Sequence, residues 1–192
     1  MTIMKSQDKL VPSLKFSHVG LFARDMDTQA NFYTSVLGFT ETDRGNLQVK
    51  GGVARLVFLS RDPDEHHQIV LVSGRPPEDH FNVINQISLK ADSLEALQEL
   101  YRQLKAKNVD ELVAVTHGNA VSLYCRDPEG NRLELYVDTP WYVSQPCRVE
   151  APIDLPTNEL LAWVERHARA LPGFKPREQW RAEMAIRMGR GT

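Results

Sequence analysis

One stretch of the sequence occurs twice in similar form. The first copy is the run Val-Phe-Leu-Ser-Arg-Asp-Pro at 57–63 followed by an apolar run at 69–72. The second copy is Val-Ser-Leu-Tyr-Cys-Arg-Asp-Pro at 121–128 followed by Leu-Glu-Leu-Tyr at 133–136. An internal repeat constrains the fold strongly, because each copy is expected to form the same structural unit. It also gives each residue of one half a counterpart in the other half.

Hydrophobic periodicity extends both copies to a complete unit. Alternation of apolar and polar residues predicts strands, and apolar residues at helical spacing predict one helix in each half. For the first half the expected elements are a strand at 16–23, a helix at 26–37 and strands near 46–50, 54–60 and 67–73. For the second half they are a strand from 84, a helix from 92 or 93 to about 107, and strands near 112–116, 120–125 and 132–138.

Each half therefore reads β-α-β-β-β, and the expected fold class is α+β. The two modules, at about 14–74 and 83–138, are expected to form a curled mixed sheet around one cleft within a paired domain at 1–143. Residues 144–192 lie outside the repeat and are expected to form an extended and helical arm. Its two helices are expected at 158–170 and 177–188.

Composition narrows the expected partners. The chain has 192 residues and a net charge of −2, which gives no reason to expect nucleic acid or an anionic membrane as a partner. Two cysteines make no disulfide framework. No apolar run has the length of a membrane span, and the first residues lack a signal core, so the expected location is the cytoplasm.

The repeat places four residues at equivalent positions of inner strands: His18, Val70, Gln86 and Glu134. Three of these four side chains can bind a metal. Period-2 alternation turns each of the three away from its apolar neighbours, so curled sheets would bring them together in one cleft. A histidine on a strand is more often structural, and a glutamine on a strand face usually has no special role, so the residues alone favour these interpretations over metal binding.

These motifs resemble the vicinal oxygen chelate superfamily, which includes glyoxalase I, bleomycin-resistance proteins, fosfomycin-resistance enzymes and type I extradiol dioxygenases. The resemblance covers about residues 14–143. The opening His18-Val-Gly-Leu-Phe, with Asn-Phe-Tyr at 31–33 and Leu-Gly-Phe at 37–39, is similar to the first strand and helix of that group. The closing Asp-Pro-Glu-Gly-Asn-Arg-Leu-Glu134 is similar to its last hairpin, in which the final Glu is a metal ligand.

Details within the superfamily are most similar to one-domain extradiol dioxygenases of the 2,3-dihydroxybiphenyl type. The segment His66-His67-Gln-Ile-Val-Leu resembles their His-His strand, which implies that His67 is the catalytic acid and base. Tyr124 precedes Glu134 at the spacing of the tyrosine that hydrogen-bonds the catecholate. Val70 fills the position that those enzymes leave without a ligand, whereas Gln86 stands where they have a second His ligand.

The resemblance implies a metal held by His18, Gln86 and Glu134. The metal would be Fe(II), with Mn, Ni or Zn as alternatives. The implied reaction is oxidative cleavage of a catechol-type aromatic by O2, in a protein that is expected to be a homodimer. His117, on the loop before the Tyr124 strand, is a candidate substrate-binding residue.

Two alternatives come from other functional classes. One is a metal-dependent isomerase or lyase of the glyoxalase type, which works without oxygen. The other is a non-catalytic protein of the bleomycin-resistance type that holds a small aromatic molecule. His67 and Tyr124 favour the dioxygenase, and Gln86 favours the alternatives.

Overall fold

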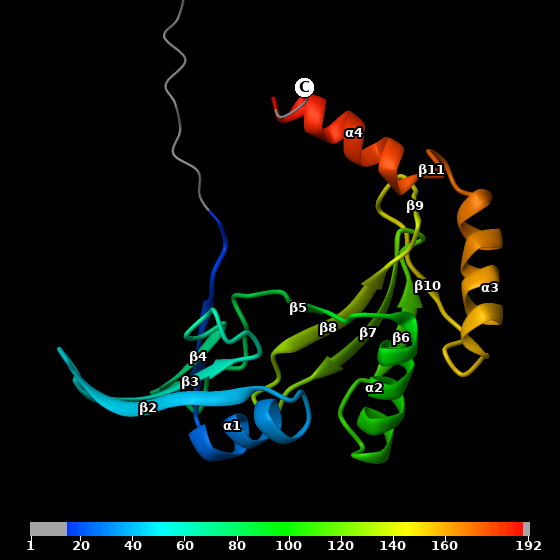
Figure 1. Cartoon of the computed structure of the whole chain (residues 1–192). Coiled ribbons are helices and arrows are strands. Elements are labelled where there is room, and N and C mark those ends of the chain that lie inside the picture. The colour runs from blue at the N-terminus through cyan, green and yellow to red at the C-terminus, as the bar shows by residue number, and fades with distance from the viewer. Residues whose placement is uncertain (1–14, 190–192) are drawn as a thin grey trace, which may run out of the picture.

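The computed structural model describes residues 15–189, and its first module is a four-stranded sheet with one helix (Figure 1). The sheet order is β1-β4-β3-β2, with β1 parallel to β4 and the other neighbours antiparallel. The elements are β1 (Val19–Ala23), α1 (Met26–Ser35), β2 (Thr40–Val49), β3 (Gly52–Ser60) and β4 (Ile69–Ser73).

The second module repeats this arrangement. Its sheet order is β10-β6-β7-β8-β5, in which β5 is parallel to β8 and the remaining neighbours are antiparallel. The elements are β5 (Ile87–Lys90), α2 (Leu94–Ala106), β6 (Val113–Thr116), β7 (Ala120–Arg126) and β8 (Arg132–Asp138), with β10 (Val149–Glu150) added at the edge. The α+β class and the two β-α-β-β-β modules are confirmed.

The sheet registers confirm the pairing of residues that the repeat predicts. Gly20 lies opposite Val70, and Ser88 lies opposite Glu134. Gly20 is two residues after His18, and Ser88 is two residues after Gln86, so Val70 and Glu134 are true counterparts. The strands of the two modules form two separate hydrogen-bonded sheets, one for each module.

Each helix covers one face of its own sheet. Asp25 caps α1 by accepting hydrogen bonds from the backbone of the first turn, and Ser93 does the same for α2. Apolar side chains then recur at helical spacing, so one stripe of each helix packs against a sheet. The residues buried there include Ala30 and Tyr33 of α1 and Leu97 and Leu104 of α2. The other face of each sheet is not covered by the helix of its module.

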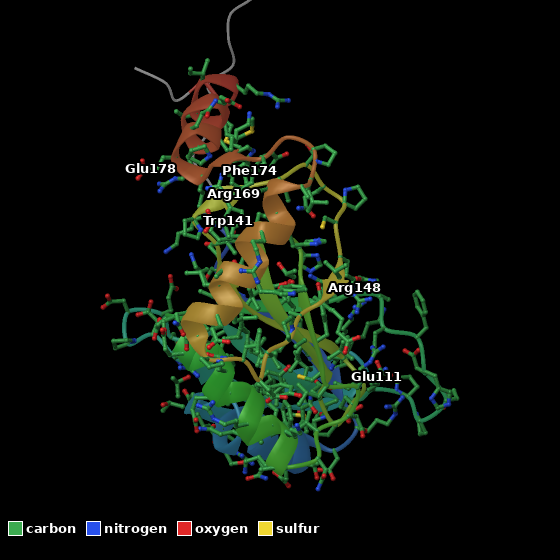
Figure 2. All side chains as sticks on the ribbon, turned by 90° about the vertical axis from the view of Figure 1, so that its right-hand side faces the viewer. Glu111, Trp141, Arg148, Arg169, Phe174 and Glu178 are labelled. Carbon is green, nitrogen blue, oxygen red and sulfur yellow. The ribbon has the colours of Figure 1, made fainter. Side chains whose placement is uncertain are left out.

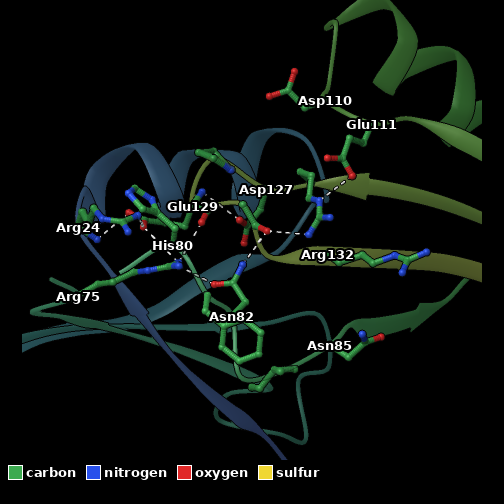
Figure 3. Close-up of a pocket in the computed structure, with 15 residues that line it drawn as sticks. Arg24, Arg75, His80, Asn82, Asn85, Asp110, Glu111, Asp127, Glu129 and Arg132 are labelled. Atoms are coloured by element: carbon green, nitrogen blue, oxygen red, sulfur yellow. Dashed lines mark hydrogen bonds and ion pairs between the residues drawn. The ribbon is translucent and has the colours of Figure 1, made fainter. Parts of the chain in front are cut away.

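The turn between β7 and β8 joins the two modules (Figure 3). Asp127 accepts hydrogen bonds from Gln29 and Tyr33 of α1. Glu129 forms ion pairs with Arg24, at 2.9 Å, and with Arg75, at 3.6 Å. The side chains of Arg75 and Glu129 are 6% and 5% exposed, so this contact is a buried clamp between the modules.

The C-terminal arm packs along the second module. β9 (Trp141–Tyr142) precedes the arm. The arm contains β10, α3 (Thr157–Arg169), β11 (Lys175–Pro176) and α4 (Arg177–Arg187), which confirms both expected helices. Trp141, Arg169 and Phe174 gather where α3 meets the strands of the arm (Figure 2). No helix within residues 15–189 combines the length and the apolar character of a membrane span.

Candidate active site around Glu134

Glu134 is the centre of a polar cluster on the second sheet. It lies on β8 between Ser88 of β5 and Tyr124 of β7, which are its direct partners in the two registers. Its carboxylate accepts four hydrogen bonds from side chains. The donors are the Gln86 amide at 2.8 Å, Ser88 at 2.6 Å, Ser122 at 2.9 Å and Tyr124 at 2.9 Å. Because a carboxylate only accepts, Gln86 presents its NH2 group to it.

This carboxylate is buried without a strong cation beside it. Glu134 is 9% exposed, and within residues 15–189 no lysine or arginine forms an ion pair with it. The nearest basic group is the His117 ring, with Nε2 3.6 Å from Oε1 of Glu134. Burial of a charge is costly unless it is compensated, so the four neutral donors are what stabilise this carboxylate in the fold.

His117 extends the cluster towards the C-terminal arm. Its Nδ1 lies 2.6 Å from the backbone oxygen of Cys147, and its Nε2 lies 3.0 Å from the hydroxyl of Tyr124. A backbone carbonyl only accepts, so Nδ1 of His117 donates a proton to it. The Tyr124 hydroxyl thus lies within hydrogen-bond distance of both His117 and Glu134.

Tyr124 keeps its proton over a wide pH range. Burial raises the pKa of its hydroxyl to about 12, and the hydrogen bond to Glu134 and the charge of that carboxylate act in the same direction. At neutral pH the group is therefore a hydrogen-bond donor with a choice of two acceptors, Glu134 and His117.

His18 and His67 form a second group, on the first module. Their ring centroids are 4.2 Å apart, and His67 also packs on Phe58 with centroids 5.1 Å apart. Burial lowers the pKa of His67, and the neighbouring rings of His18 and His66 add to this effect. Both candidates lie just before a strand rather than within one, and no hydrogen bond in residues 15–189 links them to the Glu134 cluster.

The predicted metal ligands fit a metal centre in part. In the described part of the chain, no three His, Cys, Asp or Glu side chains lie close enough together to hold a metal ion. Gln86, Ser88 and Glu134 are adjacent and offer oxygen donors, which suit a hard divalent cation. Two of the three predicted ligands are together, and the joint assignment of His18, Gln86 and Glu134 stays a prediction.

Several side chains of this cluster did not stand out in the sequence. Ser88 shares the sheet face of Gln86 through period-2 alternation, so the pattern contained that signal. Arg132 precedes Glu134 by two residues on the same face. Arg148 belongs to the arm, and no local pattern predicts that it reaches the Tyr124 ring.

Comparison with known proteins agrees with this architecture. A model of the Glyoxalase/Bleomycin resistance protein/Dioxygenase superfamily matches residues 15–135. Two relatives from Rhodococcus globerulus are biphenyl-2,3-diol 1,2-dioxygenase 2, 29% identical over 128 residues, and biphenyl-2,3-diol 1,2-dioxygenase 3, 30% identical over 129 residues. Each match covers 65% of this chain and 63% of the relative, so the chain matches less than two thirds of their length.

Solved structures show the same fold at lower identity. A glyoxylase/bleomycin resistance protein/dioxygenase domain from Frankia sp. EAN1pec is 22% identical with a TM-score of 0.57, covering 66% of this chain and 99% of that one. Glyoxalase I of Leishmania major is 20% identical with a TM-score of 0.51, covering 64% and 86%. The chain belongs to the glyoxalase/bleomycin resistance protein/dioxygenase superfamily, also called the vicinal oxygen chelate superfamily.

Proposed function

We propose that this protein is a metal-dependent, ring-cleaving enzyme of the extradiol dioxygenase type that acts on a catechol-type aromatic. The observation that carries the proposal is the Tyr124 hydroxyl, which lies within hydrogen-bond distance of both His117 and the buried Glu134. The two biphenyl-2,3-diol dioxygenases among the relatives support the same substrate class. A diol offers two adjacent oxygens, and this cluster presents a donor, an acceptor and a carboxylate side by side.

In this proposal Glu134, Gln86 and His18 would hold Fe(II) or Mn, which would supply the chemistry with O2. Ni or Zn in the same place would suit the glyoxalase-type reaction, which works without oxygen. Tyr124 donates a hydrogen bond to a substrate oxygen, and its raised pKa keeps that proton in place. Nε2 of His117 lies 3.0 Å from the tyrosine hydroxyl, and the Cys147 carbonyl holds the ring in place through Nδ1. Glu134 itself is 9% exposed, which limits its contact with water.

His67 is proposed as the residue that takes up and returns a proton during the reaction. Its lowered pKa favours the neutral imidazole at pH 7, which is the form that accepts a proton. It stands beside His18 on the first module, so this role requires a substrate that reaches both modules. The partners in this proposal are a small aromatic molecule, O2 and a second copy of the chain in a homodimer.

A second candidate is a protein that binds an aromatic ligand without metal. The hydrogen bonds to Glu134 favour this metal-free candidate, because each carboxylate oxygen already accepts two of them. In that case Gln86 is a donor that stabilises the carboxylate rather than a metal ligand. A ligand hydroxyl would then be bound by Tyr124 and His117 alone.

Oxygen consumption separates the two candidates. Protein purified without oxygen is loaded with Fe(II), freed of excess metal, and given 2,3-dihydroxybiphenyl or catechol in an oxygen electrode. The proposal predicts O2 uptake together with the absorbance of a ring-opened product. Glu134→Ala should lose both bound iron and uptake, whereas Glu178→Ala, on the exposed side of α4, should retain both. Bound iron without uptake on either diol would contradict the dioxygenase.

A further inference from the structure

Two arginines lie over the aromatic ring of Tyr124. The guanidinium carbon of Arg132 is 4.3 Å from the ring centroid, and that of Arg148 is 5.7 Å from it. The hydroxyl of the same tyrosine is 2.9 Å from Glu134. The Tyr124 side chain therefore contacts two positive charges through its ring and the candidate active site through its hydroxyl.

Neither arginine has an acidic partner in residues 15–189. Other arginines near the β7–β8 turn do have acidic partners: Arg24 and Arg75 pair with Glu129, and Arg126 pairs with Glu111. A guanidinium above an aromatic ring uses its flat face for that contact. Its N–H donors lie in the plane and remain available to a carboxylate, which they match in a two-point contact.

The two arginines come from different parts of the chain. Arg132 is half-buried on β8, two residues before Glu134, and lines a cavity of about 690 Å³ beside the β7–β8 turn. In Figure 3 its side chain extends away from Arg24, Arg75 and Glu129. Arg148 is exposed on the segment between β9 and β10 (Figure 2). It follows Cys147, whose carbonyl oxygen holds His117.

We propose that the substrate is an anion, with a carboxylate that Arg132 and Arg148 bind together while its ring oxygens meet Tyr124 and Glu134. This inference rests on the proposed function and names the substrate class of that same site. The arm takes part in specificity, because it supplies one of the two cations. Both arginines are positioned by stacking on Tyr124, so the carboxylate site and the diol site share one side chain.

Three matched ligands test the charge and the diol separately. They are 3-(2,3-dihydroxyphenyl)propanoate, which has both groups; 3-propylcatechol, which has the diol alone; and 3-phenylpropanoate, which has the carboxylate alone. Dissociation constants are measured by titration calorimetry on the full chain at low and high salt. Charged hydrogen bonds predict that the dihydroxy acid binds at least about tenfold tighter than 3-propylcatechol. High salt should reduce this ratio of affinities, because ions screen the charge of the exposed Arg148.

Variants identify the cations. Arg132→Gln and Arg148→Gln should each reduce the advantage of the dihydroxy acid over 3-propylcatechol, and the double variant should bind the two ligands with equal affinity. Arg102→Gln is the matched control, because Arg102 is an exposed arginine on α2 that pairs with Glu99. Circular dichroism spectra and thermal unfolding midpoints verify that each variant is folded.

The outcomes distinguish the two proposals. Equal binding of the dihydroxy acid and 3-propylcatechol by the wild type would overturn the carboxylate site and leave the diol function standing. An advantage that survives in the double variant would also overturn it. Binding of 3-phenylpropanoate that depends on both arginines, with no binding of 3-propylcatechol, would support the carboxylate site and contradict the diol function.

Discussion

Gln86 donates its side-chain amide to Glu134 across 2.8 Å, and this hydrogen bond joins two residues that the repeat predicts as metal ligands. The bond links the residue before β5 to the middle of β8, so the two positions are adjacent before any metal is present. A neutral amide is a weaker ligand for iron than an imidazole. The identity of residue 86 therefore controls how well this cluster holds a metal.

Replacing Gln86 with histidine should increase the affinity for Fe(II). An imidazole at this position is a stronger ligand, and we expect a gain of about tenfold or more, which corresponds to about 1.4 kcal/mol for each tenfold step. Metal content after anaerobic loading and dialysis measures it. Gln48→His, at an exposed position of β2, controls for the added histidine. An equal gain in both variants would show that residue 86 is not at a metal site.

The clamp between the modules should contribute strongly to stability. Arg75→Ala removes one cation from the buried Glu129, and because Arg24 keeps a second ion pair we expect a loss of about 3 kcal/mol, the lower end for breaking a buried pair. Urea unfolding measures the change. Arg44→Ala, at an exposed ion pair, should cost less than about 1 kcal/mol. Equal losses in the free energy of unfolding for Arg75→Ala and Arg44→Ala would mean that the clamp is not buried in solution.

The two cysteines should differ in reactivity. Cys125 is 1% exposed, and burial raises the pKa of its thiol to about 12, whereas Cys147 is half-buried beside His117. Thiolates are the reactive species, so an alkylating reagent at pH 8 should label Cys125 at least about 100-fold more slowly than Cys147. Mass spectrometry of the digested protein gives both rates. Similar rates in the folded protein would contradict the packing of β7.

Two of the five tyrosines should ionise late in an alkaline titration. Burial raises the pKa of Tyr124 to about 12 and that of Tyr33 well above 10. Both keep their protons in the folded protein while the unfolded chain loses them, so stability is present below pH 10 and falls as the pH rises from 10 towards 12. Absorbance of tyrosinate near 295 nm follows the titration. Tyr124→Phe should remove part of the late signal; an unchanged late signal would refute the assignment.

The repeat predicted the parts of the fold that depend on local alternation. It paired Val70 with Glu134 and placed Gln86 beside that glutamate, because equivalent strands have equivalent registers. Strand β2 was expected only near 46–50, although it runs from Thr40 to Val49. Every one of its residues is exposed, so alternation gave no signal over its first half.

Contacts between distant segments were beyond the reach of the pattern. The bond from His117 to the carbonyl oxygen of Cys147 depends on the path of the arm, and so does the approach of Arg148 to Tyr124. Cys147 and Arg148 have no counterparts in the first half, because the arm lies outside the repeat. The separate placement of the His18–His67 pair and the Glu134 cluster likewise depends on how the two modules pack, which no local periodicity encodes.

The most direct test of the central claim is an anaerobic crystal structure of the Fe(II)-loaded protein with 2,3-dihydroxybiphenyl. The account predicts a diol with its oxygens beside Glu134 and Tyr124, and a Gln86 amide whose oxygen has turned towards the metal. A diol bound elsewhere, with the four hydrogen bonds to Glu134 intact, would contradict the assignment of this cluster as the active site.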